Sequence, residues 1–132
     1  MRVWSGRVLA LVAWLLVACA VVQFFLAGLG VFVGPAGWAR HKAFVDGWQY
    51  LAPLALVLAY VARTTRGPKV IGWLMLGLIW LQYTTIAQRL APGHQAWAAL
   101  HPVGGALIFW LSTELARRTT RPPNTLPLPS EP

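Results

Sequence analysis

Residues 8–33 read VLALVAWLLVACAVVQFFLAGLGVFV and contain no charged side chain. A helix needs about 20 predominantly apolar residues to cross the hydrocarbon core of a bilayer. This stretch is long enough, and its most polar side chain is that of Gln23. It therefore predicts a membrane-spanning helix.

The composition predicts the same environment for the rest of the chain. Of its 132 residues, 58% are hydrophobic and only 11% are charged, whereas about a quarter are charged in an average soluble domain. Further apolar stretches follow at residues 43–61, 70–87 and 97–113. Because a bilayer leaves backbone groups no water to bind and short loops join antiparallel helices, we expect an all-α fold. The expected architecture is an integral membrane, up-down four-helix bundle.

We expect one transmembrane domain over residues 1–120, with helices at about 7–32, 38–63, 70–89 and 95–117. Pro53 should kink the second helix, since proline removes a backbone hydrogen bond. Residues 121–132 are rich in proline, which predicts a disordered tail.

The basic residues indicate the orientation in the membrane. The net charge is +8, and its distribution argues against a nucleic-acid partner. Three basic residues fall on one side of the predicted helices (Arg40, Lys42, Arg89) and eight on the other (Arg2, Arg7, Arg63, Arg66, Lys69, Arg117, Arg118, Arg121). Since Lys and Arg accumulate on the cytoplasmic side, we expect a multi-pass protein of the bacterial cytoplasmic membrane with both termini cytoplasmic.

The two halves of the chain share a pattern of polar residues. Gln23 is followed after a Gly/Pro turn by His41, and Gln82 is followed in the same way by His101. A tryptophan precedes each histidine by three or four residues. The pattern predicts two helical hairpins in a parallel repeat, related by a pseudo-twofold axis along the membrane normal.

His41 and His101 are the candidate metal ligands, because the topology places both at the outer side. The second and fourth helices of a square bundle lie on a diagonal, with axes about 11–14 Å apart. That gap suits a flat macrocycle with one imidazole on each face. Gly104 and Gly105 follow His101 by three and four residues, and we expect their missing side chains to leave room for a porphyrin. His94, two turns before His101, is the alternative fourth-helix ligand.

The remaining polar residues allow two interpretations each. Gln23 and Gln82 either join helices by hydrogen bonds or contact a cofactor or a quinone. Asp46 either serves a proton relay or a cofactor, or pairs with Lys42 or Arg89. For Glu114 we expect a surface ion pair with Arg117 or Arg118, because residues three and four apart are helical neighbours. The tryptophans at 38, 48 and 97 suit an outer aromatic belt. No catalytic residues are predicted, since no nucleophile constellation is present.

Three short segments carry a family resemblance: VQFFLAG at residues 22–28, His41-Lys42, and Leu100-His101-Pro102. They resemble small uncharacterised four-helix membrane proteins of the actinobacterial type, and the layout is similar to one four-helix half of haem A synthase. The resemblance covers residues 8–115 and implies that His41 and His101 are an axial pair for haem. The synthase carries a glutamate just before its second-helix histidine, where this chain has Trp38, Ala39 and Arg40. The resemblance therefore implies haem binding rather than haem synthesis.

We accordingly expect a protein that binds one haem b near the outer leaflet through two histidines. Six-coordinate haem serves electron transfer or haem handling rather than oxygen binding, so a stand-alone catalyst is not expected. The expected partners are the lipid bilayer, a quinone or a redox protein, and a homo-oligomer or a larger membrane complex. The alternative is a structural or accessory subunit without a cofactor.

Overall fold

The computed structural model describes residues 2–88 and 92–120, and every regular element in these residues is helical. The elements are α1 (Arg2–Phe32), α2 (Pro35–Trp48), α3 (Leu51–Val61), α4 (Arg66–Ala87), the short 3-10 helix η2 (Gln95–Ala99) and α5 (Leu100–Thr120). This confirms the all-α fold class. The predicted tail at residues 121–132 and Arg89 lie outside the described residues.

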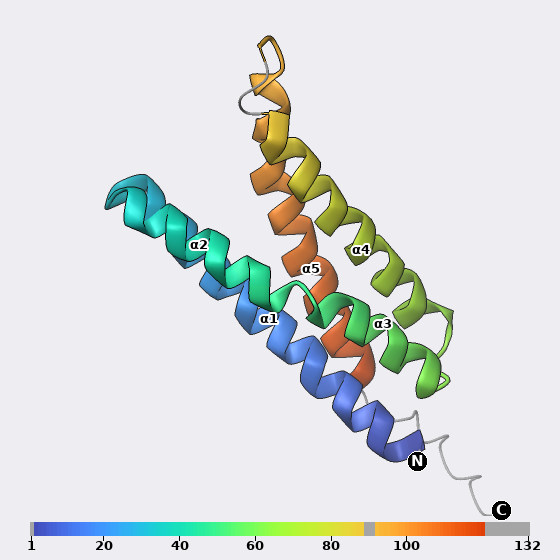
Figure 1. The fold of residues 1–132 in the computed structure, drawn as a ribbon. Coiled ribbons are helices and arrows are strands. Elements are labelled where there is room, and N and C mark those ends of the chain that lie inside the picture. Colours follow the sequence, from blue (N-terminus) through green and yellow to red (C-terminus); the bar gives the residue numbers. More distant parts are fainter. Residues whose placement is uncertain (1, 89–91, 121–132) are drawn as a thin grey trace, which may run out of the picture.

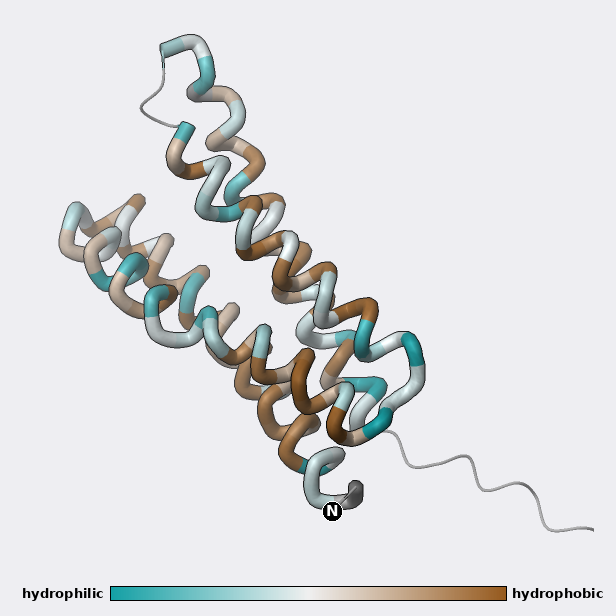
Figure 2. The backbone as a smooth tube through the Cα atoms, turned by 45° about the vertical axis from the view of Figure 1, so that its right-hand side comes forward, coloured by the Kyte–Doolittle hydropathy of each residue, from teal (hydrophilic) through white to brown (hydrophobic). Residues whose placement is uncertain are grey.

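The helices pack together at one end and separate at the other. Helix α1 packs against α2, α3 and α5, and α4 packs against α3 and α5. From the shared end, the hairpin of α1 and α2 diverges from that of α4 and α5 (Figures 1 and 2). The core lies at the packed end and is built from small and aliphatic side chains, which include Leu9, Leu16, Ala52, Met75 and Leu115.

The second predicted helix is two helices, because the chain breaks between α2 and α3 at Gln49 and Tyr50. Pro53 has no backbone N–H, so the carbonyl of Gln49 loses its usual partner four residues later. The Ala52 backbone N–H donates to that carbonyl instead, at 3.3 Å. We expected Pro53 to kink one helix. The structure instead has a break between two helices, one turn before the proline.

A tight contact between two glycines joins α1 to α2. Gly34 has a φ of 139°, a conformation that favours glycine, and Pro35 follows as the first residue of α2. A Cβ atom on Gly37 would overlap the backbone of Leu29 and Gly30. The two helix backbones therefore touch at this point, and only glycine fits at position 37.

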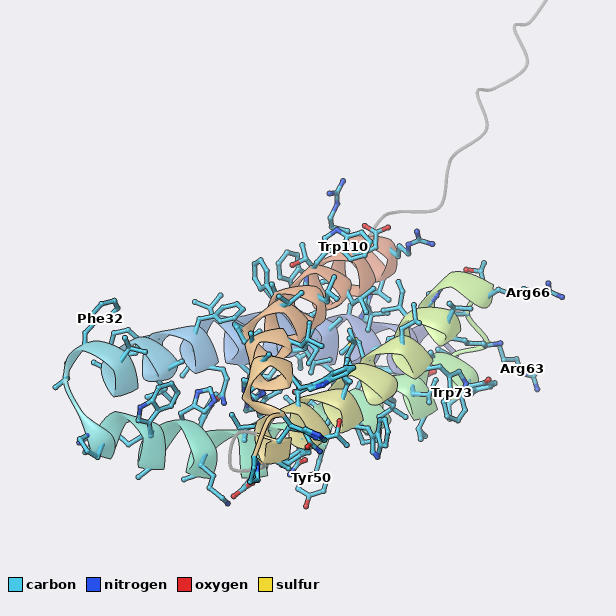
Figure 3. The ribbon with its side chains drawn as sticks, turned by 90° about the horizontal axis from the view of Figure 1, so that it is seen from above. Phe32, Tyr50, Arg63, Arg66, Trp73 and Trp110 are labelled. Atoms are coloured by element: carbon cyan, nitrogen blue, oxygen red, sulfur yellow. The ribbon has the colours of Figure 1, made fainter. Side chains whose placement is uncertain are left out.

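Three helical segments are long and apolar enough to cross a membrane: residues Trp4–Phe32, Pro35–Val61 and Arg66–Ala87. Helix α5, which covers the fourth predicted span, is not among those found in the described residues, and its last turns carry Glu114, Arg117 and Arg118. Many large apolar side chains point outward along the helices. Tyr50, Trp73 and Trp110 lie at the periphery, and Arg63 and Arg66 lie at the end opposite Phe32 (Figure 3).

Candidate functional site

His41 and His101 meet where the two hairpins separate. His41 lies in the second turn of α2 and His101 is the second residue of α5. Their ring centroids are 6.3 Å apart and the ring planes are inclined at 58°. Trp38, one turn before His41, packs against the His41 ring edge-on at 5.7 Å. Two imidazoles separated by sixty residues of sequence thus face each other.

Each imidazole is fixed by the same hydrogen bond to the preceding long helix. His41 Nδ1 lies 3.2 Å from the backbone oxygen of Gln23, and His101 Nδ1 lies 3.1 Å from the backbone oxygen of Gln82. A carbonyl oxygen only accepts hydrogen bonds, so Nδ1 carries the proton in both rings. The other nitrogen, Nε2, then keeps its lone pair in a neutral ring, which is the arrangement of a histidine ready to bind a metal.

Gln23 connects three parts of the first hairpin. Its side-chain Nε2 donates to the backbone oxygen of His41 at 3.1 Å, and its Oε1 accepts from the indole Nε1 of Trp48 at 3.4 Å. Trp48 is buried, with 9% of its surface exposed. The helix-joining interpretation of Gln23 is therefore the one that the structure shows. The prediction of a belt position for Trp48 was wrong, because its indole turns inward to this amide.

Gln82 and Phe24 occupy the space that we expected at the two glycines of α5. A Cβ atom on Gly104 would come within 2.7 Å of Gln82 Oε1, and one on Gly105 within 3.4 Å of both Gln82 Nε2 and the Phe24 ring. The glycines therefore let α4 and α1 approach α5, and the expected opening beside them is filled. Gln82 Oε1 is buried there and has no hydrogen-bond partner among the residues that the structure describes.

His94 lies apart from the histidine pair. It is exposed at the start of η2, and its Nδ1 is 3.2 Å from the side-chain Oε1 of Gln88. Of the two candidates for the fourth-helix ligand, His101 is the one whose ring faces His41.

A polar network crosses from α2 to α4 near the histidine pair. Lys42 Nζ forms an ion pair with Asp46 Oδ2 at 2.8 Å, as one of the two interpretations of Asp46 predicted. The Tyr83 hydroxyl donates to Gln49 Oε1 at 3.0 Å and lies 3.5 Å from Asp46 Oδ1. Gln49 Nε2 donates to the Asp46 backbone oxygen at 3.2 Å. Sequence reasoning missed Gln49 and Tyr83; their only signal was polarity beside an apolar run.

The predicted surface ion pair at the other end of the protein is present. Glu114 Oε1 lies 2.7 Å from Nε of Arg118, one turn later on α5. This confirms one of its two predicted partners.

The two imidazoles are close enough that one metal ion could bind both of them. A histidine nitrogen binds a transition metal at about 2.0–2.1 Å and lies about 1.1 Å from its ring centroid, so two rings on opposite sides of one ion are about 6.3 Å apart. The observed separation of 6.3 Å matches this value. Within the described residues, no group of three or more His, Cys, Asp or Glu is placed to hold a metal.

Comparison with known proteins identifies a family without assigning an activity. Residues 23–90, slightly more than half of the chain, match the family of unknown function DUF6220. The match includes Gln23, His41, Asp46 and Tyr83 and ends before His101. No curated protein and no solved structure matches the chain.

Proposed function

The chain belongs to the DUF6220 family of unknown function, and we propose that it binds one haem b between His41 and His101 for electron transfer or haem handling. The observation that carries the proposal is the imidazole pair, with centroids 6.3 Å apart and with both Nδ1 atoms bonded to backbone carbonyls. Both features support two histidines that would hold one iron through their Nε2 atoms.

A porphyrin suits this pair better than a bare ion. The described residues provide two nitrogen ligands and no third protein ligand, whereas a porphyrin supplies four nitrogens of its own. Haem held by two histidines is six-coordinate and provides one-electron chemistry when bound. His41 and His101 would hold the iron, and the Gln82 amide and the Phe24 ring are the adjacent side chains that would have to make room.

The proposed membrane arrangement is an up-down four-helix bundle with both termini in the cytoplasm of a bacterium. Helix α5 supplies the fourth span in this arrangement, and the two hairpins form a parallel repeat. Two observations support it. Arg63 and Arg66 lie together at one end of the molecule (Figure 3), as the excess of basic residues on the inner side requires. The histidine-to-carbonyl bond also recurs in both hairpins.

Helix lengths support a site near the outer leaflet. From Arg66 to Gln82 the α4 helix rises about 24 Å, and the hydrocarbon core is about 30 Å thick. The level of the histidine pair is therefore within a few ångströms of the outer edge of the core. One haem at this depth cannot carry an electron across the whole bilayer, so a quinone or a redox protein must exchange electrons with it.

Absorption spectroscopy tests the proposal. The protein is purified in mild detergent from cells supplied with a haem precursor, and spectra are recorded before and after reduction with dithionite. We expect a red preparation with a sharp reduced α-band. His41→Ala and His101→Ala should each lose the six-coordinate spectrum, while His94→Ala, the matched control, should keep it.

Circular dichroism of every variant separates loss of haem from loss of fold. A folded, colourless wild-type protein would overturn haem binding and leave the accessory-subunit alternative. A spectrum that disappears in His94→Ala and persists in His101→Ala would overturn the ligand assignment.

A further inference from the structure

The network of Lys42, Asp46, Gln49 and Tyr83 lies on the outside of the helices, near the outer edge of the proposed hydrocarbon core. The side chains of Lys42 and Asp46 are 77% and 46% exposed, and Tyr83 is 42% exposed. Tyr83 lies about 26 Å along α4 from Arg66, inside a hydrocarbon core of about 30 Å. An ion pair and a phenol therefore face the outer part of the lipid rather than a closed protein interior.

Polar groups exposed at this level are a candidate site for a ligand that arrives through the lipid. Charged side chains within a bilayer are rare and mark functional sites. The apolar core of the bundle does not need this network, because none of its four residues belongs to the buried core. The network joins α4 to the end of α2 through Tyr83, and beyond that contact it leaves an ammonium group, a carboxylate and a phenol exposed on one surface.

The chemistry of the surface specifies the ligand. The network offers a donor in Lys42, whose ammonium group has N–H bonds beyond the one to Asp46, and acceptors in the Asp46 carboxylate and the Tyr83 oxygen. Exposed aromatic rings flank it: Trp80 lies one turn from Tyr83 on α4, and Tyr50 follows Gln49, and both are 68% exposed. A matching ligand is flat, carries oxygen atoms that accept or donate hydrogen bonds, and arrives through the lipid.

We propose that this network is a binding site for the ring of a membrane quinone or quinol. Lys42 donates to a quinone oxygen, Asp46 accepts from a quinol hydroxyl, and Tyr83 positions Gln49 and Asp46 beside the ring. The site lies beside the histidine pair, because Tyr83 follows Gln82, whose backbone oxygen holds His101. The depth rests on the membrane arrangement proposed above, but binding of the quinone does not require haem.

Fluorescence quenching by a short-chain benzoquinone tests the site. The chain has eight tryptophans, and quinones quench indole emission on contact. The purified protein in detergent is titrated with a benzoquinone that carries a ten-carbon tail. We expect saturable quenching, and Tyr83→Phe and Asp46→Asn should each weaken the apparent affinity about five- to tenfold, the usual effect of losing one hydrogen bond. Glu114→Gln, which alters the acid at the other end of the bundle, should leave the affinity unchanged.

Two controls make the result decisive. Quenching that is equal in all variants would show non-specific partition into the micelle and would overturn the site. Displacement of the quinone by phosphatidylglycerol at equal concentration would show a lipid-headgroup site and would also overturn it. The same titration on His41→Ala, which lacks the proposed haem ligand, separates the two proposals: quinone binding there without a haem spectrum supports the network site whatever becomes of the haem.

Discussion

Replacing Gly37 by alanine should open the contact between α1 and α2, and Gly47→Ala provides a matched control on the same helix. A Cβ atom on Gly37 would overlap the backbone of Gly30 and Leu29, whereas one on Gly47 meets nothing within 4 Å. Backbone atoms cannot rotate out of the way as a flexible side chain does. Helix α2 must therefore move away from α1 by roughly 1 Å to restore normal packing distances.

The change in the free energy of unfolding for Gly37→Ala follows from two opposed contributions. Overpacking of this kind costs about 1–3 kcal/mol, while glycine to alanine within a helix gains about 1 kcal/mol of helix propensity. The propensity gain is common to both variants, so the difference between them isolates the packing cost. We expect Gly37→Ala to be less stable than Gly47→Ala by about 1–3 kcal/mol.

Equilibrium unfolding in mixed micelles of a mild detergent and sodium dodecyl sulphate, followed by far-UV circular dichroism, measures this difference. His41 lies one turn after Gly37, so the same displacement should lengthen its bond to the Gln23 backbone oxygen and weaken haem retention. Equal unfolding midpoints for Gly37→Ala and Gly47→Ala would refute the reasoning, because the two helices would then not touch at Gly37.

Four further predictions concern the same stability measurement. On α4, Gly72→Ala should be less stable than Gly77→Ala by about 1–2 kcal/mol, because a Cβ at 72 approaches the side chain and backbone of α3 while one at 77 meets nothing; equal stability would contradict the packing of α3 on α4. Gln23→Leu should destabilise by about 1–3 kcal/mol, since it leaves the buried indole N–H of Trp48 unpaired and removes the second hydrogen bond to the His41 carbonyl. Gln82→Leu should be neutral or stabilising, because it removes a buried oxygen that has no partner among the described residues, and a large loss there would show that this oxygen is satisfied in the membrane. Arg63→Gly should stabilise by about 1 kcal/mol, since Arg63 has a φ of 52°, and a lower unfolding midpoint would count against that backbone conformation.

Hydropathy predicted the helices because it depends on composition over many residues. The uncharged stretch at residues 8–33 became most of α1, and the Gly/Pro turn became the start of α2. The position of the α2–α3 break could not be predicted from the sequence. Pro53 removes the hydrogen bond to a carbonyl one turn earlier, and the sequence does not show on which side of that carbonyl the helix unwinds. The structure places the break at Gln49 and Tyr50.

The candidate site likewise has features that the sequence predicts and features that it does not. Spacing and topology predicted that His41 and His101 lie at the same end of the helices. Each histidine begins the helix that follows a glutamine-bearing helix, on the other side of a short turn. The filled space at Gly104 and Gly105 was beyond prediction, because it depends on how α4 and α1 are rotated about their axes. The contact of Tyr83 with Gln49 depends on the same rotation, since it joins residues 34 positions apart. Whether His94 or His101 faces His41 also depends on how the helix is rotated about its axis. The sequence does not show that rotation, so His94 and His101 remained alternatives.

The separation of the two imidazoles has its origin in helix contacts some distance from the rings. Helix α2 makes its main backbone contacts with α1, so the position of His41 depends on the glycine contact at Gly37. Helix α1 in turn packs along α5, where the Phe24 and Phe109 rings meet edge-on at 6.2 Å. The two hairpins diverge away from the packed end (Figure 1). An ion bound by both rings would add a cross-link between the hairpins beyond the packing of Phe24 against Gly105, and binding would stabilise the fold by favouring the folded state alone.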